Sequence, residues 1–93
     1  MIRRVKLTRR ATKQLLRTPA RVERKLSTWS FLVTKLGVEE VRKMPGFHDE
    51  PLVGPRRGTR SIRLSRAYRA IYRVVREREA EFVSVEEVNK HDY

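Results

Sequence analysis

The chain has 93 residues, a length that suits one domain with one modest hydrophobic core and is too short for two. Its 23 lysines and arginines outnumber its 11 aspartates and glutamates, and the resulting net charge of +12 indicates a polyanionic partner. Cysteine is absent, which excludes disulfides and thiolate metal ligands, and with only two histidines we expect neither a metal nor another cofactor.

No apolar run approaches the roughly 18 residues that a membrane span needs. The first sixteen residues alternate basic and apolar side chains and lack the continuous apolar core of a secretory signal. We therefore expect no membrane contact and a cytoplasmic protein.

The N-terminal segment is predicted to form a short strand and then a helix. Apolar residues stand among basic ones over residues 1–7, which indicates a strand that ends at Thr8. Thr8 is a typical N-cap, and Ala11, Leu15 and Leu16 then fall on one face of a modest amphipathic helix.

A second, longer helix is predicted from Thr18 and Pro19, because a capping residue followed by proline is typical of a helix start. Gly37 is expected to end this helix. Its apolar residues recur at spacings of three and four: Val22, Leu26, Trp29, Val33 and Leu36.

The C-terminal half is predicted to consist mainly of strands. One or two further helical turns are expected over residues 38–44, followed by a loop that runs to about residue 58. Three runs then alternate apolar and polar residues, namely 59–64, 68–76 and 81–88, and the short polar connections between them suit antiparallel hairpins. The predicted fold is a single α+β domain over the whole chain. Two N-terminal helices cover one face of a small, mostly antiparallel sheet, and the other face is open.

Seven arginines lie within eighteen residues of the loop and the first two of these strands. Arg63 is out of phase with the apolar residues of its strand, and Arg69 and Arg73 share a parity on the next, so several should project from one face. Guanidinium groups bind phosphate oxygens bidentately, and the high net charge favours a polynucleotide ligand over a merely solvated basic face. The predicted RNA-binding residues are His48, Arg56, Arg57, Arg60, Arg63, Arg66, Arg69, Arg73 and Lys90.

Two other segments carry groups that suit the cleavage of RNA. In the loop His48-Asp49-Glu50-Pro51-Leu52, Glu50 beside cationic side chains would stay ionised and can take a proton from a ribose 2′-hydroxyl, and His48 is the alternative base. Near the end of the chain, His91 can donate a proton to a leaving 5′-oxygen, and Tyr93 can stack on a base. Taken alone, each segment is better explained as an ordinary surface loop or a frayed terminus.

Taken together, these features resemble a known family. The strand-helix-helix-sheet order, the loop HDEPL, the strand pair RSIRLSRAYRAIYRVV and the ending VNKHDY are similar to the RelE/ParE toxin superfamily, close to its HigB- and YoeB-type branches. The resemblance covers nearly the whole chain. It implies the toxin of a type II toxin-antitoxin system, which cuts messenger RNA on the ribosome by 2′-hydroxyl attack without a metal and so inhibits translation. It also implies a cognate antitoxin encoded beside the toxin.

The same resemblance assigns roles to four residues. Glu50 matches the general base of the family, Arg69 the arginine at the scissile phosphate, His91 the general acid and Tyr93 the aromatic residue that orients the base. Arg63 stands where relatives place a lysine or arginine for phosphate.

The ending departs from the family pattern, because Asp92 stands between the histidine and the tyrosine. Relatives also differ over whether a loop histidine such as His48 contributes, so the division of acid and base roles stays open. Two alternative functions are a ParE-like toxin that inhibits DNA gyrase and a basic nucleic-acid-binding module without catalysis.

Overall fold

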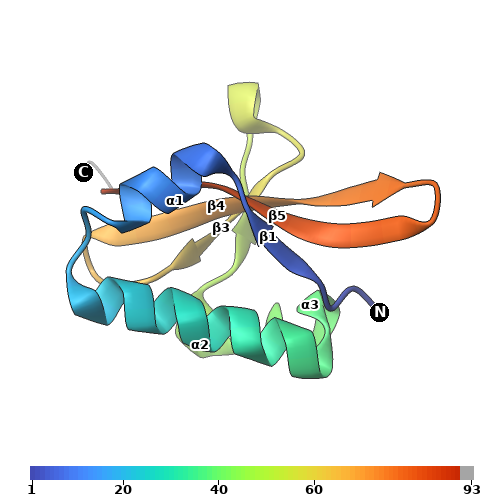
Figure 1. Ribbon diagram of the computed structural model, residues 1–93, viewed down its shortest axis with the longest axis horizontal. Helices are drawn as coiled ribbons and strands as arrows, with labels where there is room; N and C mark the ends of the chain where they lie inside the picture. Colours follow the sequence, from blue (N-terminus) through green and yellow to red (C-terminus); the bar gives the residue numbers. More distant parts are fainter. Residues whose placement is uncertain (91–93) are drawn as a thin grey trace.

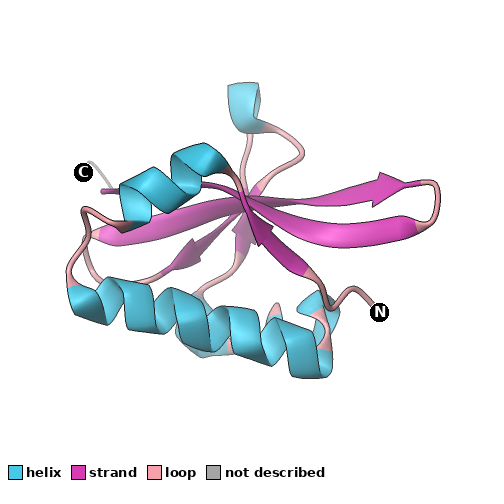
Figure 2. Ribbon diagram, in the orientation of Figure 1, coloured by secondary structure: helices cyan, strands magenta, loops and turns pink. Residues whose placement is uncertain are grey.

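The computed structural model describes residues 1–90 of the chain (Figure 1). Its elements are β1 (Val5–Leu7), α1 (Arg9–Leu15), α2 (Ala20–Leu36), α3 (Val38–Val41), η1 (Pro45–Phe47), β2 (Glu50–Pro51), η2 (Gly54–Arg56), β3 (Arg60–Arg63), β4 (Tyr68–Glu77) and β5 (Ala80–Lys90). Within these residues one five-stranded sheet has the order β1-β5-β4-β3-β2, and only the β1–β5 pair is parallel. Helices packed on a mostly antiparallel sheet confirm the predicted α+β class (Figure 2). No helix within residues 1–90 is long and apolar enough to span a bilayer.

The helix starts follow the predicted chemistry at one helix and depart from it at the other. The Ala11 backbone N–H donates to Thr8 Oγ1 at 3.1 Å, so Thr8 caps α1 as predicted. The predicted cap at Thr18 is wrong, because the Thr18 hydroxyl donates to the Leu15 carbonyl at 2.7 Å and α2 begins without a side-chain cap. Thr18 therefore closes α1 instead of opening α2.

The first strand covers only Val5–Leu7, although it was predicted from the first residue. The Ile2 carbonyl accepts a hydrogen bond from Val38 N–H at 2.8 Å, and Ile2 N–H donates to the Glu39 carboxylate at 3.2 Å. Ile2 is thus held against α3, and backbone bonding to β5 begins only at Arg4, whose carbonyl accepts from Val83 N–H. Gly37 allows this contact, because its φ of +87° ends α2 and turns the chain into α3.

The core lies between α2 and one face of the sheet. Trp29 of α2 is fully buried, and its ring centroid lies 5.1 Å from that of Tyr72 in β4. The α1 helix contributes Ala11 to the same core and follows β5 beyond the end of β1. There the Gln14 side chain accepts a hydrogen bond from Val88 N–H at 2.8 Å, which closes this edge of the sheet.

A β-bulge interrupts the alternation of β5. Ile71 of β4 pairs with Glu87 whereas Tyr72 pairs with Val85, so Glu86 is an extra residue opposite this junction. Because of the bulge, Val85 and Val88 both reach the core despite a spacing of three.

The register defines the face of the sheet that α2 leaves open. Directly paired residues project from the same face, and Ile62, Ala70 and Val88 form a cross-strand row that belongs to the core. The neighbouring rows therefore project from the opposite face. They are Glu50, Ser61, Ile71 and Glu87 in one row and Arg63, Arg69 and Asn89 in the other.

Candidate active site on the open face of the sheet

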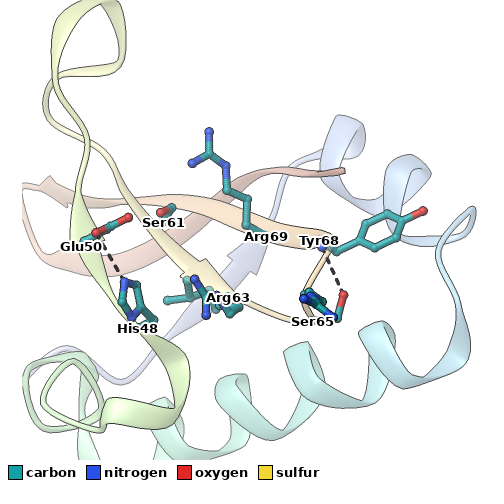
Figure 3. Close-up of a pocket in the computed structure, with 9 residues that line it drawn as sticks. His48, Glu50, Ser61, Arg63, Ser65, Tyr68 and Arg69 are labelled. Atoms are coloured by element: carbon teal, nitrogen blue, oxygen red, sulfur yellow. Dashed lines mark hydrogen bonds and ion pairs between the residues drawn. The ribbon is translucent and has the colours of Figure 1, made fainter. Parts of the chain in front are cut away.

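A small open pocket of about 80 Å³ lies among the η1–β2 segment, β3 and β4 (Figure 3). It is lined by His48, Glu50, Ser61, Ile62, Arg63, Ser65, Arg66, Tyr68 and Arg69. Arg63 and Arg69 are direct partners in the β3–β4 register, and they project from one face, as the strand parity predicted for several of these arginines. The structure thus brings five of the predicted site residues together from three segments of the chain.

His48 and Glu50 stand side by side at one end of this pocket. His48 Nε2 lies 3.7 Å from Glu50 Oε2, and both side chains are exposed (Figure 3). His48 follows η1 in the left-handed backbone region, with a φ of 48°, so the chain turns sharply just before β2. The two residues predicted as alternative bases, His48 and Glu50, therefore lie next to each other, and a protonated His48 can form an ion pair with the Glu50 carboxylate.

Asp49, between them, faces the opposite way and holds the loop in place. Its side chain is 1% exposed and accepts hydrogen bonds from Arg60 Nε at 2.6 Å and from the Tyr72 hydroxyl at 2.5 Å. Burial, and then the hydrogen bond to Asp49, raise the pKa of Tyr72, so this hydroxyl remains a donor. Asp49 thereby ties the backbone between His48 and Glu50 to the core. Its role was not foreseen from the sequence, although a carboxylate flanked by two candidate catalytic groups was visible there.

Arg69 carries a donor that the rest of the described chain leaves unsatisfied. Its Nε is buried and has no hydrogen-bond partner within residues 1–90, and no carboxylate of that range pairs with it. A buried N–H without an acceptor costs free energy that an anionic ligand can recover. Figure 3 shows Arg69 projecting from β4 between the Glu50 and Tyr68 ends of the site.

Glu87 is a second carboxylate on the open face, and no role was predicted for it from the sequence. Its side chain is 12% exposed and accepts hydrogen bonds from both terminal nitrogens of Arg56, while Arg10 lies 3.6 Å away. The Arg56 hydrogen bonds hold the pKa of Glu87 below its usual value. Glu87 therefore fastens the η2 loop to the sheet. The consecutive glutamates of β5 between Val85 and Val88 were the available signal, since they break the alternation of that strand.

The other predicted RNA-binding residues are distributed over several places. Arg60 pairs with Asp49 and lies in the row of Tyr72, apart from the pocket, and Arg73 pairs with Glu86 at 2.7 Å. Arg57 is exposed near η2, and Lys90 pairs in register with Tyr68. The predicted residues His91 and Tyr93, together with Asp92, lie outside the described residues. Within residues 1–90, no three histidine, aspartate or glutamate side chains gather as metal ligands.

Comparison with known proteins places the fold. No protein-family model and no curated protein matches the chain. Among solved structures, YafQ from E. coli strain BL21(DE3) is similar, with a TM-score of 0.72 and 16% identity over 95% of this chain and 92% of YafQ. The toxin-antitoxin complex RelBE2 from Mycobacterium tuberculosis matches with a TM-score of 0.67 and 22% identity, covering 98% of this chain and 100% of the matched chain.

The YoeB/ParE toxin from Agrobacterium tumefaciens is a third similar structure, with a TM-score of 0.67 and 21% identity. This match covers 96% of our chain and 99% of that toxin. The matched chains of YafQ, YoeB/ParE and RelBE2 belong to the RelE-like toxin superfamily. Because the matches extend over nearly the whole of each chain, this chain has the RelE-like toxin fold.

Proposed function

We propose that the chain is the toxin of a type II toxin-antitoxin system, an endoribonuclease that cuts messenger RNA on the ribosome and so inhibits translation. One observation carries this proposal. Arg69 lines one pocket with Glu50 and His48, so a guanidinium group that can bind phosphate stands beside two groups able to move protons. The RelE-like fold supports it independently.

The reaction that suits this arrangement is attack by a ribose 2′-hydroxyl on the adjacent phosphorus. Glu50, or alternatively His48, takes the 2′-hydroxyl proton while the 2′-oxygen bonds to phosphorus. The bond to the 5′-oxygen breaks, and His91 supplies the proton that this leaving oxygen needs. The products are a 2′,3′-cyclic phosphate and a 5′-hydroxyl, and no water is consumed.

Arginine supplies the electrostatic part of the proposed reaction. Arg69 would contact the scissile phosphate and Arg63, its cross-strand partner, the same phosphate or the next one. Guanidinium groups placed there stabilise the extra negative charge of a pentavalent phosphorane, and the route needs no metal. Tyr93 would stack on a neighbouring base.

The proposed partners are messenger RNA, the ribosome and a cognate antitoxin. The similar YafQ is also known in a DinJ-YafQ toxin-antitoxin complex, and RelBE2 is likewise such a complex. A strongly basic protein is complementary in charge to an acidic protein that binds and neutralises it, so we propose an antitoxin for this chain as well.

The proposal predicts that purified protein cleaves messages on translating ribosomes. Glu50→Gln should slow cleavage about a hundred- to ten-thousand-fold, because it removes a proton acceptor. Arg69→Gln should slow it about a hundred- to thousand-fold, because it removes a donor at the developing charge. Primer extension on the extracted message, sampled over time, gives both rates.

The matched control is Arg21→Gln, which removes one charge from the exposed surface of α2 and should leave the rate unchanged. Undiminished cleavage by both site variants would contradict the assigned site. Failure of the wild-type protein to cleave, together with RNA binding that weakens steeply with salt, would instead show a nucleic-acid-binding module.

A further inference from the structure

The β4 strand extends well beyond its neighbour β3. The first residue of β3, Arg60, pairs with Tyr72, whereas β4 continues past that point to Glu77. Over Arg73–Glu77, β5 is the sole strand partner of β4 among the described residues. Figure 1 shows this part of the β4–β5 hairpin projecting past the rest of the sheet.

Backbone groups of this extension point toward the vacant side. The Tyr68 carbonyl accepts from Leu64 N–H at 2.9 Å, so Tyr68 directs its backbone groups toward β3. The direction of the backbone N–H and C=O groups alternates from one residue to the next along a strand. The groups of Val74 and Arg76 therefore point to the same side as those of Tyr68, at positions where β3 is no longer present. Such an edge is a template for another strand.

A wide groove of about 710 Å³ runs along this edge. Its lining combines five arginines with apolar side chains and includes no carboxylate. The lining residues are Arg42, Pro51, Leu52, Val53, Gly54, Arg57, Gly58, Thr59, Arg60, Tyr72, Arg73, Val74 and Arg76. Val53 is 85% exposed in this groove, so a large apolar surface there lacks cover within residues 1–90.

The arginines of the groove retain capacity for an acidic ligand. Arg57 has no carboxylate partner within residues 1–90. Arg73 and Arg76 pair with glutamates of β5 at 2.7 Å, but these guanidinium groups are exposed. Exposed ion pairs contribute little free energy, so a bound carboxylate can share or replace them.

The opposite edge of the sheet provides a contrast. Beyond the end of β1, α1 runs along β5, and Gln14 accepts the hydrogen bond of Val88 N–H. The fold therefore closes one strand edge with its own helix and leaves the other with arginines and an exposed valine.

We propose that the groove along Arg73–Glu77 binds an extended acidic segment of a partner protein, which adds to β4 as a further strand. The free backbone edge selects a peptide, because RNA offers phosphates but no ladder of backbone N–H and C=O groups. The arginines select acidic side chains, and Val53 and Val74 select apolar ones between them. This inference does not depend on the proposed RNA cleavage.

An end-blocked eight-residue peptide of alternating glutamate and valine tests the proposal. We expect saturable binding by calorimetry, with the largest amide chemical-shift changes at residues 73–77. A fully N-methylated version keeps the side chains but donates no backbone hydrogen bond, and it should bind at least about tenfold more weakly. Equal binding of the two peptides, shift changes elsewhere, or no binding would overturn the proposal.

Charge reversal separates this groove from general attraction to a basic protein. Arg57→Glu with Arg76→Glu should weaken peptide binding at least about tenfold. Arg21→Glu with Arg24→Glu makes the same charge change on exposed α2 and should have a much smaller effect. All four side chains are exposed, and circular dichroism checks that both variants fold.

Equal losses in the two double variants would overturn the proposal. A second contrary result would be that oligouridylate binds in this groove and the peptide does not. Loss of the oligouridylate binding in the Arg57→Glu, Arg76→Glu variant would place that binding in the groove. Neither result would bear on ribosomal cleavage, which is measured separately.

Discussion

Glu87 joins two distant segments to the sheet through its carboxylate. Arg56 of the η2 loop and Arg10 of α1 both approach it, and the Arg56 hydrogen bonds lower its pKa below the ordinary value of 4.5. A carboxyl whose folded pKa is depressed stabilises the fold above its unfolded pKa. That contribution is lost as the pH falls through the folded pKa, so the stabilising effect of Glu87 belongs to neutral pH and fades in acid.

Replacing this carboxylate should therefore have a pH-dependent effect. Glu87→Gln is expected to lower the free energy of unfolding at pH 7 by about 1–2 kcal/mol, the range for a hydrogen bond to a charged group that is partly exposed. The difference from wild type should shrink as the pH is lowered below the unfolded pKa. Urea unfolding across this range provides the measurement, with the exposed Glu79→Gln as control. A difference that stays constant would contradict the assignment.

For single residues of the candidate site, the sequence predicted which groups are present but not which way each side chain points. Glu50, Arg63 and Arg69 were predicted from loop position and strand parity, and the structure places all three around one pocket. The direction of Asp49 was not predictable, because it is decided by the Tyr72 hydroxyl, 23 residues away in the chain. Local patterns report which groups are present, whereas tertiary contacts decide which of them turn inward.

Among the elements, α1 serves as the cover of a strand edge. Gln14 supplies the acceptor that Val88 N–H would otherwise lack on that side. Gln14→Ala should cost about 1 kcal/mol of stability and speed hydrogen exchange at the Val88 amide. Exchange followed by NMR checks this, with Lys13→Ala on the exposed surface of the same helix as control. Unchanged exchange at Val88 would argue against α1 as an edge cover.

Element prediction succeeded where one pattern governed a whole segment. The α2 helix, with its apolar spacing, and β4, with its alternation, were both identified from the sequence. The β2 strand was missed, because only Glu50 and Pro51 pair and their pairing depends on β3. The predicted strand at the N-terminus was too long for a similar reason, since Ile2 contacts α3 and leaves the sheet.

Across the whole molecule, the excess positive charge is unevenly neutralised. Three glutamates of β5 pair with arginines, while Arg57, Arg63 and Arg69 have no carboxylate partner in the described part of the chain. The unneutralised charge thus includes the two arginines that meet in the candidate site. RNA binding should draw on these groups more than on the outer surface of α2.

Salt dependence measures this distribution. Each phosphate contact to single-stranded RNA contributes a slope of about 0.7 in log K against log salt, so Arg63→Gln with Arg69→Gln should reduce the slope by about 1.4. Arg21→Gln with Arg24→Gln alters the net charge equally and should change the slope less. Fluorescence anisotropy with a labelled oligonucleotide gives both slopes, and equal reductions would mean that the charge acts without a defined binding face.

The bulge in β5 has a consequence for tolerance to changes in length. Glu86 is surplus to the ladder, because Val85 and Glu87 already face Tyr72 and Ile71, which are consecutive in β4. Deleting Glu86 would leave Glu87 opposite Ile71 and Val88 in the core, so the strand would lose a residue without exchanging its inner and outer sides. The strand can therefore lose one residue next to Glu87, the carboxylate on the open face, and keep its register with β4. Deletion of Glu86 is therefore expected to leave the same residues of this chain on the open face.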